Sequence, residues 1–217
     1  MKAWLGLLLA CAGVAHAADM TVVHFLDQDP GDPAYATRIL VTPDFLRMDG
    51  GDDGGDFVLL DRRQRQVINV MRGNKLAMVF SSGRLPPRPD GWRPQLSITP
   101  AAVGKQRYRF SVNGVVCSEG MAALQTAPDA ARAMAELKAV LAANQYRVWK
   151  ESPREMQHDC DLANLVWDSG ATLRLGLPVE EREYSGRTRL FEGQSTEPVR
   201  PELFRVPDGF ASVDAPS

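Results

Sequence analysis

An acidic run of four aspartates and four glycines, MDGGDDGGDF (48–57), is the densest group of possible metal ligands in the sequence. Aligned with an EF-hand loop, Asp49 takes position one and Asp53 takes position five, as calcium binding requires. Position three is Gly51, however, and position twelve, which needs a bidentate glutamate, is Leu60. Hairpin loops also favour Gly and Asp, because both tolerate positive φ. The run therefore favours a turn between strands, with weak calcium binding as the alternative.

Residues used in nucleophilic and metal-dependent catalysis are present, but not in catalytic patterns. Neither His24 nor His158 belongs to an H-E-x-x-H motif, and Ser169 lacks the first glycine of a nucleophile elbow. Glu181 and Glu183 could share one strand face as a carboxylate pair, but a solvated face is the simpler interpretation. We therefore expect a protein that is not an enzyme, uses no cofactor and holds no resident metal. An enzyme of unknown chemistry stays as an alternative.

The N-terminus has the three parts of a secretory signal peptide. A lysine supplies the positive region, residues 4–14 are apolar but too short to span a bilayer, and residues 15–17 (AHA) fit the small-x-small cleavage rule. Cleavage would remove residues 1–17 and place the protein in the periplasm. Leu8–Cys11 loosely resembles a lipobox, so a lipid anchor at Cys11 is an alternative. No other segment approaches the length of a transmembrane helix.

Cys117 and Cys160 are the two cysteines that remain after such cleavage. In an oxidising compartment, two and only two cysteines indicate one disulfide. The loop of about 43 residues would contribute on the order of 4 kcal/mol in the chain-entropy description. A reactive thiol pair is the alternative, although the spacing is far from C-x-x-C.

Length and charge limit the class of protein further. Residues 18–217 suffice for one sizeable core, so a single domain is predicted. The formal net charge of −2 gives no electrostatic case for a nucleic-acid partner. Arg107 and Arg109 would share one strand face and could bind a lipid phosphate or a carboxylate, although a solvated face is the simpler interpretation.

Short apolar runs separated by turn residues occupy the chain up to Phe80, which is typical of an antiparallel meander. In Phe45–Asp49, Leu46 and Met48 alternate with Arg47 and Asp49 on the opposite face. The predicted strands are Thr21–Asp27, Tyr35–Val41, Phe45–Asp49, Asp56–Asp61, Gln66–Met71 and Leu76–Phe80.

Prolines and turn signals divide the second half of the chain. Ser81–Pro100 carries five prolines and is predicted to be a long loop, either a flap or an ordered surface connection. Asn113-Gly114 predicts a hairpin within Lys105–Gly120. Ala127–Trp149 is predicted to be the one long helix, capped by Thr126. The remaining predictions are a short helix at Asp161–Trp167, closing strands in Ala171–Tyr184 and Arg187–Gly193, and a terminal turn at Val206–Phe210.

Several of these strands are apolar on both faces. Val67 and Met71 point one way, whereas Ile68 and Val70 point the other, so both faces must be covered. One helix about 10 Å wide cannot cover six or more strands spaced about 4.8 Å apart. The predicted fold class is therefore mainly β (α+β), with a curved antiparallel half-barrel sheet wrapped around one long helix. Its mouth could hold an apolar ligand, and a fully packed interior is the alternative. The candidate ligand-binding residues are Leu46, Met48, Ile68, Val70, Met78 and Phe80, with core packing as their alternative role.

This order of elements resembles that of uncharacterised proteobacterial periplasmic proteins related to the LolA/LolB-like superfamily of lipoprotein carriers. The segments Thr42–Asp49 (TPDFLRMD) and Asp56–Arg63 (DFVLLDRR) carry the resemblance best, together with the late VPDGF. The resemblance implies a half-barrel closed by helices, with an apolar cavity that receives acyl chains. The carriers have helices early in the chain, whereas the first helix predicted here begins near Ala127. None of the carriers' functional residues can be matched individually.

These observations favour a non-enzymatic periplasmic protein that binds an acyl chain, a lipid or a lipoprotein by burying apolar surface. The alternative partner is another envelope protein, on which this chain would dock as an interaction or sensing module.

Overall fold

The computed structural model describes residues 18–216, and within them twelve strands form one sheet. The predicted signal peptide (1–17) and the possible anchor at Cys11 lie outside the described residues. The strand order is β12-β6-β5-β4-β3-β2-β1-β11-β10-β9-β8-β7. Neighbours are antiparallel except for β12, which pairs in parallel with β6. The strands are β1 (Asp19–Gln28), β2 (Tyr35–Val41), β3 (Phe45–Asp49), β4 (Phe57–Asp61), β5 (Gln66–Met71), β6 (Leu76–Ser81), β7 (Pro94–Pro100), β8 (Lys105–Val112), β9 (Val115–Ala123), β10 (Leu177–Glu183), β11 (Thr188–Pro198) and β12 (Ala211–Asp214).

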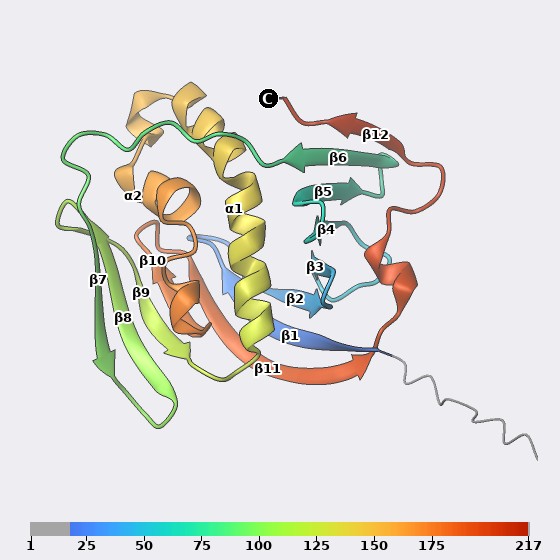
Figure 1. Ribbon diagram of the computed structural model, residues 1–217, viewed down its shortest axis with the longest axis horizontal. Coiled ribbons are helices and arrows are strands. Elements are labelled where there is room, and N and C mark those ends of the chain that lie inside the picture. The colour runs from blue at the N-terminus through green and yellow to red at the C-terminus, as the bar shows by residue number, and fades with distance from the viewer. Residues whose placement is uncertain (1–17, 217) are drawn as a thin grey trace, which may run out of the picture.

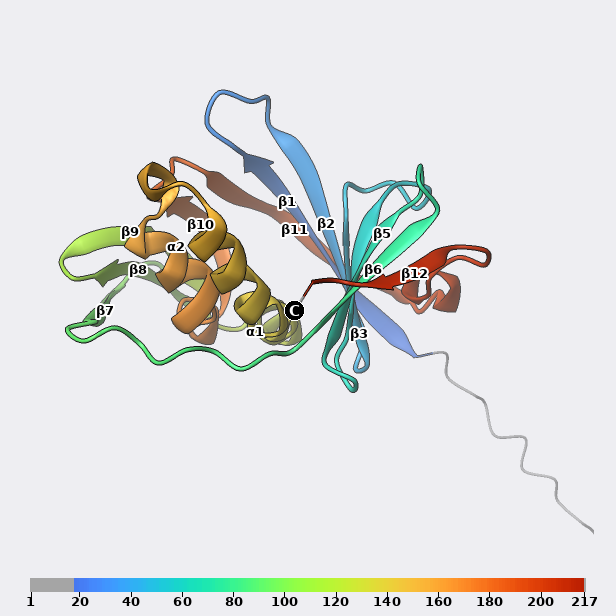
Figure 2. The same ribbon diagram turned by 90° about the horizontal axis from the view of Figure 1, so that it is seen from above.

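The sheet bends around a helical layer (Figures 1 and 2). In Figure 2 the helices lie in the angle between two groups of strands, β7–β10 on one side and β3–β6 with β12 on the other. The helices are α1 (Pro128–Glu151) and α2 (Asp159–Leu162), with helical turns at Arg154–Met156, Ala163–Trp167, Leu173–Leu175 and Pro201–Phe204. The predicted fold class, mainly β with a curved sheet around one long helix, is confirmed.

Local sequence signals place most elements correctly. The bounds of β2, β3 and β5 are those predicted, and the hairpin of β8 and β9 turns at Asn113 and Gly114. Both of these residues have positive φ, 52° and 84°, as a two-residue hairpin turn with the twist of the strands requires.

Four features differ from the sequence prediction. The closing strand predicted in Ala171–Tyr184 begins only at Leu177, because Leu173–Leu175 form a helical turn. The proline-rich segment is not a loop throughout, because β7 pairs with β8 at the sheet edge, where prolines at the strand ends cost no ladder hydrogen bond. Thr126 does not cap α1: the helix follows Ala127, which has a φ of 39° and gives no side-chain cap. The short strand β12 follows the predicted terminal turn and was not predicted.

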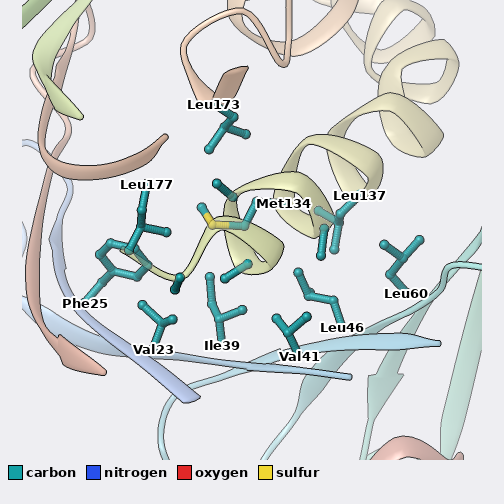
Figure 3. Packing of buried hydrophobic residues seen from close by; sticks show 14 of the residues in the cluster. Val23, Phe25, Ile39, Val41, Leu46, Leu60, Met134, Leu137, Leu173 and Leu177 are labelled. Carbon is teal, nitrogen blue, oxygen red and sulfur yellow. The ribbon is translucent and has the colours of Figure 1, made fainter. Parts of the chain in front are cut away.

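The inner face of the sheet packs against α1 (Figure 3). Met134 and Leu137 of α1 point toward Ile39, Val41 and Leu46 of the sheet. Pro128 occupies the first turn of α1, where its missing N–H is not needed, and buried residues then recur at helical spacing. This packing holds α1 along the trough of the curved sheet.

The opposite, outer face of strands β1–β5 is covered as well. Leu203 and Phe204, in the helical turn after β11, form a second cluster with buried residues of these strands. The expectation that both faces are covered is confirmed, but the cover on the outer face is the C-terminal segment, which the sequence did not reveal. The sheet residues of this cluster are Met20, Val22, Leu40, Phe57, Leu59 and Val70.

Cys117 of β9 and Cys160 of α2 form the predicted disulfide. Both cysteines are buried, in a third cluster that includes Phe110 and Val112 of β8. The bond fixes the short helices after α1 to the half of the sheet that lies far from β6. Trp92, within the proline-rich segment, packs on the same cluster.

Candidate functional site

A cavity of about 140 Å³ lies between α1 and the inner face of the sheet. Ile39 of β2, together with Leu46 and Met48 of β3, forms the apolar wall on the sheet side. Met134 and Leu137 of α1 face them, and the remaining apolar lining comes from Leu173 and Pro178. The cavity therefore has an apolar half built where the curved sheet and α1 diverge.

The other half of this cavity is polar and charged. Lys138 follows Leu137 on α1, Glu181 and Glu183 come from β10, and Arg187 and Arg189 come from the β10–β11 turn and β11. Side chains two residues apart on a strand share a face, so β10 turns both glutamates toward the helices. The solvated face expected for this glutamate pair is therefore not what the structure contains.

Asp27 of β1 contacts both arginines of this wall, and Asp29 supplies a second negative charge beside Arg187. Arg189 donates two hydrogen bonds of 2.7 Å to the Asp27 carboxylate, and Thr37 donates a third of 2.8 Å. Arg187 lies 3.5 Å from Asp27 and 3.6 Å from Asp29. Burial alone raises the pKa of Asp27, but hydrogen bonds and charge from Arg189 outweigh it and hold that pKa below its ordinary value.

The two glutamates of β10 have different surroundings. Glu181 accepts a 2.6 Å hydrogen bond from the Tyr108 hydroxyl. Glu183 accepts no side-chain hydrogen bond and joins no ion pair within the described chain. Burial, together with the negative charge of Glu181, raises the pKa of Glu183 above its ordinary value. Glu183 is thus a half-buried carboxylate that lines the cavity.

A second, smaller cavity of about 10 Å³ adjoins the first. The two cavities share Lys138, Thr172, Glu181 and Glu183. The rest of the small cavity is mostly polar, with Ser118, Asn164, Asp168 and Ser169 in its lining. Its volume is close to the minimum that holds one water molecule. The small polar cavity therefore lies beside the charged end of the larger one, with the four shared residues between them.

The structure separates the six predicted ligand-binding residues. Leu46 and Met48 line the cavity. Phe80 packs against the inner cluster, and Met78 lies in the same cross-strand row as Met48 but three strands away. Ile68 and Val70 lie on the outer face, against the cluster that the C-terminal segment covers. Alternation along β5 therefore prevents these last two from sharing a cavity with Leu46.

Several lining residues were not among those predicted. Met134 and Leu137 carry a signal in the sequence, since they repeat at helical spacing on the buried side of α1. The charged wall carries no comparable signal, because long-range pairing of β10 with β9 and of β11 with β1 brings these strands to α1. Leu173 and Thr172 lie in a short helical segment that periodicity cannot detect.

The acidic run forms the loop between β3 and β4, as the turn interpretation predicts. Arginines hold its carboxylates: Arg38 lies 2.8 Å from Asp49 and 2.6 Å from Asp53, and Arg200 lies 2.8 Å from Asp53. Across residues 18–216, no group of three or more His, Cys, Asp or Glu residues is placed to hold a metal ion. No described helix is long and apolar enough to cross a membrane.

Arg107 and Arg109 lie on the outer face of β8, where a shallow groove of about 710 Å³ crosses strands β7–β11. Ser97 and Thr99 of β7 and Arg182 of β10 also line this groove. The guanidinium of Arg109 lies 3.0 Å from Glu119 and is therefore already paired. The predicted sharing of a face by the two arginines is confirmed, and both are separated by the sheet from the cavity under α1.

Comparisons with known proteins give remote likenesses only. No family model matches the chain, and no curated protein matches it. Two structures of PNGF-II, in space groups P21 and C2, align with TM-scores of 0.38 and 0.36 at 10% and 9% identity. Each alignment covers 91% of this chain but only 32% and 31% of the PNGF-II chains, so this chain spans about a third of their length.

The crystal structure of a LolA superfamily protein from Nitrosomonas europaea aligns with a TM-score of 0.32 at 9% identity. This alignment covers 87% of the present chain and 90% of the other. The superfamily is the one that the sequence resembles. At these TM-scores and identities, the likenesses assign the chain to no family and support no function.

Proposed function

We propose that this protein is a non-enzymatic binding protein whose single domain, residues 18–217, takes the end of an acyl chain into the cavity under α1. The supporting observation is the apolar half of that cavity, lined by Leu46, Met48, Met134, Leu137 and Leu173. Burial of aliphatic carbons against such a wall contributes about 0.8 kcal/mol per CH₂ group. The acyl chain is proposed to belong to a lipid or a lipoprotein.

The size of the cavity limits what it can hold. In another protein, an engineered apolar cavity of about 150 Å³ stays dry and binds benzene. The whole cavity of about 140 Å³ found here, its charged end included, is therefore about the size of a six-carbon molecule. A longer acyl chain would extend out of the cavity or displace α1 from the sheet. We therefore propose that only the terminal carbons of the chain are bound.

The proposed location is the periplasm. Disulfides persist in oxidising compartments, and the buried bond between Cys117 and Cys160 fits an extracytoplasmic protein. The predicted signal peptide at residues 1–17 would take the chain there.

Native mass spectrometry of the purified protein, followed by titration with hexan-1-ol monitored by NMR, tests this function. Six buried carbons predict a dissociation constant on the order of 1 mM. Met48→Trp fills the cavity and is expected to abolish binding. Met78→Trp is the matched control, since it makes the same change on the same sheet face, outside the cavity.

Co-purified lipid and binding that Met48→Trp alone abolishes would support the proposal. If hexan-1-ol does not bind, or binds equally to both tryptophan variants, the proposal is wrong. A bare mass together with a stable protein partner would instead support the docking module.

A further inference from the structure

The place where the apolar and polar cavities meet is formed by Lys138, Thr172, Glu181 and Glu183. These four residues, called the ring below, come from α1, the segment before Leu173, and β10. A ligand whose tail fills the apolar half can present its other end to them. The chemistry of this ring decides which head group the cavity accepts.

The nearby arginines do not supply free positive charge to this ring. Arg189 is held by the two 2.7 Å hydrogen bonds to Asp27, and Arg187 lies between Asp27 and Asp29. Asp168, in the small cavity, is likewise engaged by Arg88 at 2.7 Å and by the indole N–H of Trp92 at 3.1 Å. The charges around the ring are therefore already paired.

Within the ring, two carboxylates face one ammonium. Glu181 has the Tyr108 hydroxyl as a donor, whereas Lys138 donates only to the Asn164 carbonyl, at 3.5 Å. No described side chain donates a hydrogen bond to Glu183. The ring thus carries one excess negative charge and contains one carboxylate with unused acceptor positions, next to the apolar half of the cavity.

We propose that the ligand is an amphiphile with a primary ammonium head, whose tail fills the apolar half of the cavity and whose head donates hydrogen bonds to Glu183. This inference rests on the proposed function, since it names the class of ligand for the same cavity. Hydrogen bonds from an ammonium to a carboxylate are the stronger, charge-assisted kind. A carboxylate or phosphate head at the same place would meet two like charges.

The acid–base behaviour of Glu183 agrees with this class of ligand. Burial and the charge of Glu181 raise its pKa, while Lys138, Arg187 and Arg189 oppose that rise. A bound cation beside Glu183 would stabilise its charged form. Affinity for an ammonium ligand is therefore expected to fall when acid protonates Glu183.

Three ligands of equal tail length test the inference: hexylammonium, hexan-1-ol and hexanoate, titrated into the folded protein near neutral pH and monitored by NMR. Hexylammonium is expected to bind at least about tenfold more tightly than hexan-1-ol, as one charge-assisted hydrogen bond implies. Hexanoate is expected to bind most weakly. Glu183→Gln should reduce hexylammonium to the affinity of hexan-1-ol.

Glu180→Gln provides the matched control, because Glu180 is an exposed glutamate of the same strand, β10, and lies on the opposite face of the sheet. This variant should keep the order of the three ligands. Binding of hexanoate as tight as that of hexylammonium, or an unchanged preference in Glu183→Gln, would overturn the inference and leave the proposed function standing. If none of the three ligands binds, both proposals fail.

Discussion

The guanidinium of Arg47 lies over the ring of Phe57, with its Cζ atom 4.0 Å from the ring centroid. The Arg47 side chain is fully buried, at 0% exposure, on the outer face of the sheet. Its Nε donates to Asp49 at 2.6 Å, and its Nη1 donates to the Leu203 carbonyl at 3.0 Å. One charged side chain therefore joins β3, β4 and the C-terminal segment that covers them.

Replacing Arg47 with methionine is expected to lower the free energy of unfolding by about 3 kcal/mol, because a buried ion pair loses one partner and the Leu203 carbonyl loses its donor. Chemical denaturation measures the change. Arg63→Met is the matched control, since the ion pair of Arg63 with Asp44 is exposed and such pairs contribute about 1 kcal/mol or less. Equal losses in the two variants would contradict a structural role for Arg47.

Local patterns predicted the strands and the trough, but they could not predict which segments cover which face. The alternation in Phe45–Asp49 separates Leu46 from Arg47 correctly. It cannot show that Leu203 and Phe204, about 150 residues later, bury Arg47 instead of leaving it in water. The cavity could be predicted only in part for the same reason. Strand periodicity predicted Leu46 and Met48, whereas long-range strand pairing brings Glu183 to α1. Ile68 and Val70 share the apolar character of Leu46 but not its face.

Arg62 is expected to hold the first half of α1 on the sheet. Its guanidinium contacts Glu136 at 2.6 Å and Asp129 at 3.1 Å, and its side chain is 8% exposed. Arg62→Met should cost about 1–2 kcal/mol of stability, since buried hydrogen bonds to charged groups are lost. It should also speed amide hydrogen exchange at the start of α1.

Arg132 offers a matched control for Arg62, because it pairs with the same two carboxylates from the helix surface. Its side chain is 68% exposed. Arg132→Met is therefore expected to change stability by about 0.5 kcal/mol or less. If amide hydrogen exchange at the start of α1 became equally faster in both variants, the contact of Arg62 with the helix would not be what stabilises that part of α1.

Two C-terminal truncations separate the roles of the outer cover and of β12. Ending the chain after Phe210 removes β12, whose residues are all exposed, while keeping Phe210 on the outer cluster, and is expected to leave a folded protein. Ending it after Pro198 also removes Leu203 and Phe204 and should cost more than about 5 kcal/mol, a large part of the stability of a domain. Thermal unfolding and solubility measure both. A soluble, cooperatively folded shorter chain would contradict the proposed role of this cover.

Glu183 should give stability an unusual dependence on pH. Because its pKa is raised from 4.5 in the folded protein, the folded state holds that proton more tightly than the unfolded chain does. Its contribution to stability is fully present below pH 4.5 and is lost as the pH rises through the folded pKa. Asp27 has the opposite sign: its pKa is lowered from 3.8, so its contribution is present above pH 3.8 and is lost as the pH falls through the folded pKa.

Glu183→Gln should therefore gain stability relative to the wild type as the pH increases from about 4 to about 8, since the variant keeps a neutral side chain at a desolvated position. Asp27→Asn should show the reverse, with its largest loss at neutral pH, where Arg189 is left beside a neutral amide. Denaturation curves at several pH values give both differences. A constant difference between Glu183→Gln and wild type over this range would mean that Glu183 is well solvated, and the ammonium site would lose its physical basis.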